Sequence, residues 1–246
     1  MIIELPCGLI KDGVVYDHVK ISEIRGKQQN YLVDTELVTE NFGHVPKLLS
    51  ELVSDFQTKQ GLPAGVPASE ALWKLPTEDI EVILIKIREA TYGPNFAVPT
   101  LCLHCGKEQL KKLDLRELAI RALPDKMTRT KVIQLPKSGI EAEVKLLYLK
   151  DLFDLYKSIK ENKTTLYTAT TYLSLARLGD KTTITAADLD TIPVTDIQFI
   201  EKTYLELRGS IDLMITHTCD ACGKDYENPL GVLDPNFFGQ SQTPST

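Results

Sequence analysis

The stretch TYGPNFAVPTLCLHCGKEQ, residues 91–109, contains a Cys-x-x-Cys pair followed directly by glycine and lysine. The same signature returns more than a hundred residues later in THTCDACGKDYENPL, residues 216–230. Two such pairs, each flanked by strand-like sequence, are the usual way to build a four-thiolate metal site from two tight turns, or knuckles. The sequence therefore predicts one zinc site, whose ligands are Cys102, Cys105, Cys219 and Cys222.

A knuckle suits thiolate ligands because its backbone amides donate to sulfur, and its glycine accepts a backbone conformation that other residues disfavour. The lysine that follows offsets part of the negative charge. Four thiolates fill the tetrahedral coordination of Zn²⁺ and leave no open position, so we expect a structural and not a catalytic ion. We expect His104 to be exposed, because the middle residues of the turn point away from the metal, and His217 to be a strand residue.

The wide separation of the two pairs bears on the topology. In a compact ribbon the pairs lie about 15–20 residues apart, whereas 113 residues lie between Cys105 and Cys219. We therefore expect the intervening segment to be inserted between two knuckle hairpins that pack face to face, with the ion closing a long loop. Two alternatives remain open: each pair is a separate metal-free feature, or each pair meets a pair from another subunit.

Composition narrows the class of protein. The 246 residues, 43% of them hydrophobic, can bury one substantial core or two small ones. The net charge of −6, without a basic stripe, makes nucleic acid an unfavourable main partner. No apolar run reaches the roughly 20 residues of a membrane span, and the start MIIELPCGLIKDG lacks the features of a signal peptide. We expect no membrane association and a cytoplasmic protein with reduced thiols, in which Cys7 is a turn or core residue.

The first half of the chain reads as a β-hairpin followed by helices. The strand-forming segments MIIEL and VVYDHVKI flank Asp12-Gly13, which suits a type I′ turn. Residues 27–60 look mostly helical, and their end carries one apolar stripe. The stripe consists of Val45, Leu48, Leu49, Leu52 and Phe56.

After the loop GLPAGVPASE, Thr77 is expected to cap a helix that runs to Gly93. The apolar face of this helix is predicted to be Ile80, Ile83, Leu84 and Ile87. Arg88 and Glu89 are predicted to lie on its solvated face.

The second half continues with helical patterns at residues 151–161 and at residues 164–179, the latter ending at Gly179. A further helix is predicted from a capping box of Thr195 with Gln198 and a hydrophobic staple of Val194 with Phe199. Its predicted buried face is Ile197, Ile200, Tyr204 and Leu207. This helix leads into the strand SIDLMITHT and the second knuckle.

One internal likeness stands out. The segment VIQLPKSGIEAEVKLLYLKD, residues 132–151, shares an apolar strand, Leu-Pro, a nearby glycine and a second strand with IIELPCGLIKDGVVYDHVKI, residues 2–21. Leu-Pro can end a strand and glycine can turn the chain, so a local cause and an internal duplication are both open.

These patterns indicate an α+β fold, with helices packed on small antiparallel β-hairpins and a zinc ribbon split into two Cys-x-x-Cys knuckles, because hairpins and helices come in blocks. We expect residues 1–246 to form a single compact unit. Its expected parts are an N-terminal hairpin with helices (1–97), the first knuckle (98–115), an inserted hairpin and helical segment (116–209), the second knuckle (210–235) and a flexible tail (236–246).

The order of features resembles a known family. An ELP strand with a nearby glycine, the segment ISEIRGKQQNYL, a helix ending IREATYG and an immediately following knuckle resemble the baseplate hub assembly proteins of T-even-like contractile-tailed phages. The resemblance covers most of residues 1–150, and the second knuckle extends it towards the C-terminus. It implies a non-enzymatic hub component or hub assembly chaperone, with baseplate hub proteins as partners. It also implies a location in the host cytoplasm during assembly or in the tail baseplate of the virion.

Two other classes are compatible with cysteine knuckles. A zinc-ribbon regulator that binds nucleic acid or polymerase is the main alternative, although the acidic charge disfavours it. An enzyme is a weaker one, because the sequence contains no phosphate-binding glycine loop, nucleophile elbow or His-Glu-x-x-His motif.

Overall fold

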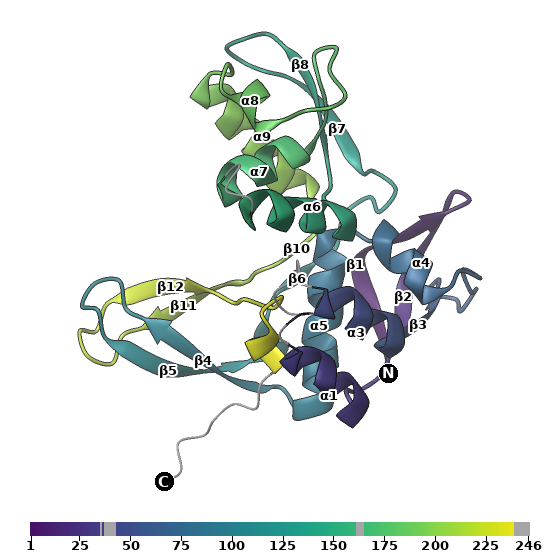
Figure 1. The fold of residues 1–246 in the computed structure, drawn as a ribbon, viewed down its shortest axis with the longest axis vertical. Coiled ribbons are helices and arrows are strands. Elements are labelled where there is room, and N and C mark those ends of the chain that lie inside the picture. The colour runs from purple at the N-terminus through teal and green to yellow at the C-terminus, as the bar shows by residue number, and fades with distance from the viewer. Residues whose placement is uncertain (35, 37–42, 161–164, 239–246) are drawn as a thin grey trace.

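The structure is a computed structural model that describes residues 1–34, 36, 43–160 and 165–238. The expectation of a flexible tail falls, from residue 239 onward, outside the described residues. Figure 1 shows three parts: a body at the N-terminal end, a lobe formed by the middle of the chain, and an arm of paired hairpins that projects from the body. Helices and small antiparallel sheets make up the body and the lobe, and antiparallel hairpins make up the arm, so the predicted α+β class is confirmed.

The body contains a three-stranded antiparallel sheet in the order β1 (Ile2–Lys11), β2 (Val14–Ile21) and β3 (Val53–Gln57). The predicted hairpin is confirmed, and its turn has positive φ at both central residues, 50° at Asp12 and 74° at Gly13. This is the geometry of a type I′ turn, which matches the right-handed twist of the two strands.

The prediction of helix through residues 27–60 is wrong at its end. After α1 (Gly26–Val33) and α3 (His44–Leu52), the chain becomes extended at Val53 and pairs with β2. Phe56 is buried as predicted, but it reaches the core from a strand in which Asp55 takes a positive φ of 52°. Pairing with the free edge of β2 overrides a helical pattern that is only local.

The central helix of the body is α5 (Thr77–Tyr92), which follows α4 (Ala68–Ala71) and the short 3₁₀ helix η1 (Leu72–Lys74). The predicted cap is wrong: Pro76 occupies the N-cap position, and Thr77 is the first helical residue. Proline fixes φ near its helical value and lacks the N–H that a helix start would leave unpaired. The predicted apolar face is fully buried, at Ile80, Ile83, Leu84 and Ile87.

Arg88 was predicted to face solvent, and this is wrong. Its side chain is fully buried, with Nε donating to the carbonyl oxygen of Phe237 at 2.8 Å and the guanidinium lying 4.3 Å from the ring centroid of Phe96. Both partners come from elsewhere in the chain, so the pattern of the helix alone could not reveal them. Glu89 is half-buried and pairs with Lys86 at 2.7 Å.

The side chains of Glu78 and Asp79 are fully buried at the start of α5, and that of Glu81 is partly buried. Both carboxylate oxygens of Asp79 accept backbone N–H groups, from Cys7 and Gly8, each at 2.8 Å. Glu78 lies 3.2 Å from the Arg208 guanidinium, which also approaches Glu81. Burial raises the pKa of Glu78, and it raises those of Asp79 and Glu81 to about 7 despite these partners.

The lobe contains a second antiparallel sheet in the order β7 (Thr130–Gln134), β8 (Glu141–Lys145) and β9 (Leu175–Leu178). Its helices are α6 (Leu149–Lys160), α7 (Leu166–Leu173), α8 (Ala186–Leu189) and α9 (Val194–Leu207). The helix predicted to reach Gly179 ends at Leu173, and the next residues form β9 against β8. The cause is again pairing with the free edge of a neighbouring strand, here β8, which overrides the local helical pattern.

The start of α9 differs from the predicted capping box and staple. Pro193 is the N-cap residue, and Val194 and Phe199 are exposed. The polar side chain that bonds here is Asp196, and its partners lie in a distant loop. Its two carboxylate oxygens accept the backbone N–H groups of Lys137 and Ser138, each at 2.8 Å. On the predicted apolar face, Ile200, Tyr204 and Leu207 are buried and Ile197 is partly buried.

The arm consists of two antiparallel hairpins. The first joins β4 (Asn95–Leu101) to β5 (Glu108–Asp114), and the second joins β11 (Met214–Thr218) to β12 (Asp225–Pro229). At the base, β6 (Ile120–Arg121) pairs with β10 (Ser210–Ile211). The 3₁₀ helices η2 (Leu115–Glu117) and η3 (Pro235–Phe238) follow the two hairpins.

The buried side chains form two main clusters, one in the body and one in the lobe. The segment after the second hairpin belongs to the body cluster through Leu230, Val232, Phe237 and Phe238. Cys7 is fully buried, as expected of a core residue, and burial raises the pKa of its thiol. Among the described helices, none has the length and apolar character needed to cross a membrane.

The raised pKa values of the acidic residues at the start of α5 predict how the free energy of unfolding depends on pH. Because the pKa of Glu81 rises from 4.5 to about 7 on folding, the folded protein binds more protons than the unfolded chain between these values. The free energy of unfolding should therefore fall as pH rises through this range and level off above it. Glu81→Gln removes a negative charge that repels Glu78. The substitution should therefore raise the free energy of unfolding at about pH 8 and flatten its dependence on pH.

Urea unfolding at several pH values, followed by circular dichroism, measures this. Glu70→Gln is the matched control, because Glu70 is exposed and its pKa is lowered by Lys74. A Glu81→Gln protein with the same pH profile as the unchanged protein would contradict the assignment.

Candidate metal centre

The two knuckles have the same backbone geometry. In the first, the Cys102 N–H donates to the Lys107 carbonyl at 3.0 Å, and the Gly106 N–H donates to the Cys102 carbonyl at 2.8 Å. In the second, the N–H of Cys219 and the N–H of Gly223 make the equivalent bonds, both at 2.9 Å. The two glycines have φ of 69° and 70°, in the left-handed region where a side chain would be strained.

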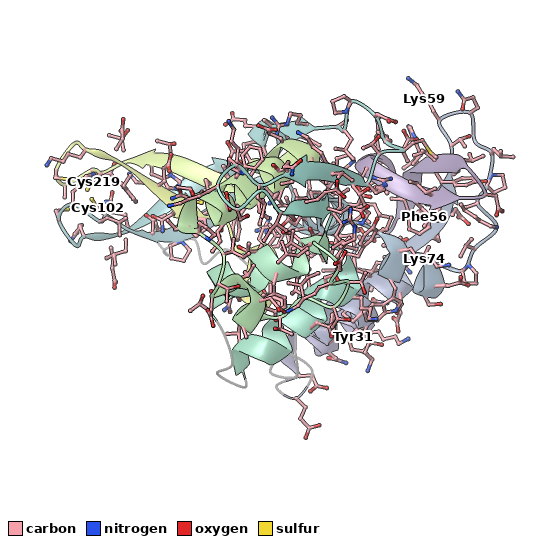
Figure 2. The ribbon with its side chains drawn as sticks, turned by 90° about the horizontal axis from the view of Figure 1, so that it is seen from above. Tyr31, Phe56, Lys59, Lys74, Cys102 and Cys219 are labelled. Atoms are coloured by element: carbon pink, nitrogen blue, oxygen red, sulfur yellow. The ribbon has the colours of Figure 1, made fainter. Side chains whose placement is uncertain are left out.

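The knuckles bring the four predicted cysteines together. The Sγ atoms of Cys102 and Cys222 lie 3.8 Å apart, those of Cys105 and Cys219 lie 3.7 Å apart, and all four lie within 4.8 Å of one another. Four bonds of about 2.3 Å around a tetrahedral ion place the sulfurs about 3.8 Å apart. The spacing of the thiols therefore fits a single metal ion. Figure 2 shows Cys102 and Cys219 beside one another near the end of the arm.

The electrostatics of the thiols also fit a cation. Against the effect of burial, hydrogen bonds from the backbone N–H groups of Cys222 and Ala221 lower the pKa of Cys219 to about 6. Despite a backbone hydrogen bond at Lys107, desolvation within the cluster and hydrogen bonds with the three neighbouring thiols raise the pKa of Cys105 to about 12. Crowded thiols cannot all ionise without a positive charge among them, and a metal ion supplies that charge.

Gln109 is a residue of the centre that the sequence pattern did not predict. Its Nε2 donates to Cys219 Sγ at 3.0 Å, and its Oε1 accepts the Asp220 backbone N–H at 2.9 Å. One amide side chain on the first hairpin thus holds both the sulfur of Cys219 and the backbone of the second knuckle. Lys111, two residues further along β5, pairs with Asp220 at 2.6 Å. Only the alternation of side chains along a strand after the first knuckle could have suggested these contacts.

The two neighbouring histidines lie outside the group of four sulfurs. His104 is exposed as predicted, and its Nε2 is 3.0 Å from the Asp225 carbonyl oxygen. His217 lies on β11, also as predicted, where burial lowers its pKa and its ring lies 5.8 Å from that of Tyr226. The hydroxyl of Tyr226 reaches Thr100 of the first hairpin at 2.7 Å, so the arm has a packed interior beneath the knuckles.

Comparison with known proteins gives one family. Residues 17–234 match the family model described as T4 bacteriophage base plate protein. The matched range contains both knuckles and everything between them, so it extends the resemblance seen in the first half of the sequence and confirms its baseplate character. No significant match was found among curated proteins or among solved structures.

The first prediction for this centre concerns metal content. Protein purified gently under reducing conditions should contain about one metal ion per chain, and Cys105→Ser or Cys219→Ser should each lose most of it, because three thiolates cannot complete the site. Cys7→Ser should leave the metal content unchanged, since Cys7 lies in the lobe cluster. Elemental analysis provides the measurement, and a metal-free unchanged protein would rule out the site.

The second prediction for this centre concerns Gln109. Gln109→Leu removes the hydrogen bond to Cys219 and leaves all four ligands in place, so metal affinity should fall about 10- to 100-fold while stoichiometry at saturation stays the same. Competition with a chromophoric chelator measures the affinity. Gln29→Leu, at an exposed position on α1, is the control. Equal affinities for the two variants would show that Gln109 does not support the metal.

Proposed function

Because the chain belongs to the T4 bacteriophage base plate protein family, we propose that it is a non-enzymatic assembly protein that helps to build the baseplate hub of a contractile phage tail. A structural four-cysteine zinc site stabilises it. The family match over residues 17–234 is the observation that carries the proposal. The protein acts in the host cytoplasm during assembly or in the tail baseplate of the virion, and its partners are baseplate hub proteins.

The identity of the ion follows from the ligand set. Four thiolates in tetrahedral arrangement are typical of structural Zn²⁺, whereas Mg²⁺ and Ca²⁺ require oxygen ligands. When bound, the ion supplies charge neutralisation and a fixed cross-link between the two hairpins. Cys102 and Cys219 hold it from the buried side, and Cys105 and Cys222 from the exposed side.

A binding role agrees with the surface of the arm. Leu101, Leu103 and Leu110 expose 46%, 78% and 47% of their surface on or beside the first hairpin. Exposed apolar side chains gathered on a projecting element are typical of protein contacts. A hollow of about 500 Å³ beside the same hairpin is lined by six of its residues and by Asn228 of β12; the six are Pro99, Thr100, Leu101, Glu108, Gln109 and Leu110. This lining offers apolar contact and contains no pair of acid and base groups.

The experiment is affinity purification of tagged protein from infected cells, combined with proteomics of purified particles. The unchanged protein should recover hub proteins, and Leu103→Asp with Leu110→Asp should lose them, because charge on the arm opposes apolar contact. Leu205→Asp is the matched control, since Leu205 is 57% exposed on α9 in the lobe. All three proteins should contain the same amount of metal.

Each outcome of this experiment decides between roles. Presence in purified particles identifies a hub component, and absence together with recovery of hub proteins identifies an assembly chaperone. Recovery of polymerase or nucleic acid in place of hub proteins would overturn the proposal in favour of a zinc-ribbon regulator.

A further inference from the structure

The spacing from helix to knuckle is the same in the two halves of the chain. Cys102 follows Asp79 by 23 residues, and Cys219 follows Asp196 by 23 residues. Each aspartate is the third residue of a long helix, α5 or α9, and each helix has proline as its N-cap residue. Each helix then leads through a strand segment into a knuckle with the sequence Cys-x-x-Cys-Gly-Lys.

The two aspartates bind equivalent loops. Asp79 accepts the two N–H groups directly after Leu5-Pro6, and Asp196 accepts the two directly after Leu135-Pro136. All four bonds measure 2.8 Å. The partners are 72 residues apart for Cys7 with Asp79 and 59 apart for Lys137 with Asp196. A local tendency of Leu-Pro to end a strand does not account for the same two-bond clamp from a distant helix.

The sheets follow the same plan. In each half, a hairpin is joined by a third antiparallel strand, giving β1-β2-β3 and β7-β8-β9. In each half the third strand comes immediately after a helix, α3 or α7, and its pairing with the middle strand contains a register shift. The hairpin of the lobe is shorter than that of the body. The two halves therefore differ in the length of their strands but have the same order of elements.

The metal centre shows how the two halves are related in space. The first cysteine of each knuckle pairs with the second cysteine of the other, Cys102 with Cys222 and Cys219 with Cys105, at nearly equal distances of 3.8 and 3.7 Å. A two-fold rotation exchanges such pairs. The side chains that cross between the hairpins also occupy equivalent positions, seven residues after the first cysteine: Gln109 in one and Tyr226 in the other.

We infer that the chain is a tandem duplication of one hairpin–helix–knuckle unit, residues 2–114 and 130–229, and that the metal ion joins the two repeats across a pseudo-two-fold axis. The segment expected to be an insertion between the knuckles thus contains most of the second repeat. The duplication rests on the backbone plan and the two clamps alone. The role of the ion as a joint rests on the metal site in the proposed function.

The repeats have diverged where they meet. On α5, the fully buried Glu78 and the partly buried Glu81 lie against Arg208 at the end of α9, whereas the equivalent α9 residues, Thr195 and Gln198, are exposed. At the metal, Gln109 donates to a ligand sulfur, while Tyr226 bonds to Thr100. The joint is therefore built from unlike side chains on a common backbone plan, as expected for fused repeats that no longer need to be identical.

The duplication is tested by an experimental structure of the whole chain with anomalous scattering at the zinc edge. One rotation close to two-fold, passing through the zinc, should carry the first Leu-Pro loop, clamp helix and knuckle onto the second. If these three features need different rotations, or if the clamps are absent, the duplication is wrong whatever the metal content.

The joint is tested by cutting the chain between the repeats. A protease site placed between Met127 and Thr128, both exposed, yields two fragments that stay in the folded protein. With the N-terminal fragment immobilised, chelator should release the C-terminal fragment at least about tenfold faster than zinc-containing buffer, because structural zinc contributes strongly to association. Cys219→Ser in the cut protein should release quickly in both buffers, and Cys7→Ser should behave like the unchanged protein.

Release at the same rate with and without zinc would overturn the joint. This outcome is distinct from failure of the proposed function, which is read from the recovery of hub proteins by the uncut chain.

Discussion

The structure depends on the meeting of four cysteine sulfurs, brought within 4.8 Å of one another from two distant parts of the chain. Thiolates at this distance repel one another, and isolated two-stranded hairpins are at best marginally stable. The packed interior beneath the knuckles is small, consisting of Cys102, Cys219 and Tyr226. Packing alone therefore gives the arm little stability. The cation that we propose would remove the repulsion between the thiolates. It would also cross-link two hairpins that neither a shared sheet nor a large core holds together.

The second hairpin also determines how the body closes. The chain that leaves β12 runs back over α3 and α5, where Leu230, Val232 and Phe237 join the body core. The carbonyl of Phe237 accepts from the buried Arg88, and the carbonyl of Leu233 lies 3.2 Å from His44 Nε2. A buried arginine without such acceptors would be costly. The position of the second knuckle and the closure of the body are therefore coupled through one short segment.

Sequence alone predicted the features that have a local cause. The type I′ hairpin follows from Asp12-Gly13, the buried face of α5 from its apolar period, and the meeting of the cysteines from the knuckle signature. The predictions that failed concern residues whose structure is determined by contacts with a distant segment of the chain. Residues 53–57 and 175–178 are strands because a neighbouring strand offers a free edge. Arg88 is buried because the C-terminal segment covers it. The helices α5 and α9 begin directly after Pro76 and Pro193 and not after a capping threonine, and the aspartate at the third position of each helix binds a distant loop. Gln109 acts across the arm, and only the alternation of side chains along the strand after the first knuckle could have suggested it.

The same reasoning links the metal to the proposed function. A closed four-thiolate site leaves no coordination position for a substrate, so within this proposal the ion acts through shape. It fixes one hairpin against another and so fixes the arm on which Leu101, Leu103 and Leu110 are exposed. A flexible arm would lose conformational entropy when a partner bound it, and this loss would weaken the complex. An arm already ordered by the ion avoids most of that loss. The ion can therefore strengthen the association with a hub protein without any contact between the metal and that partner.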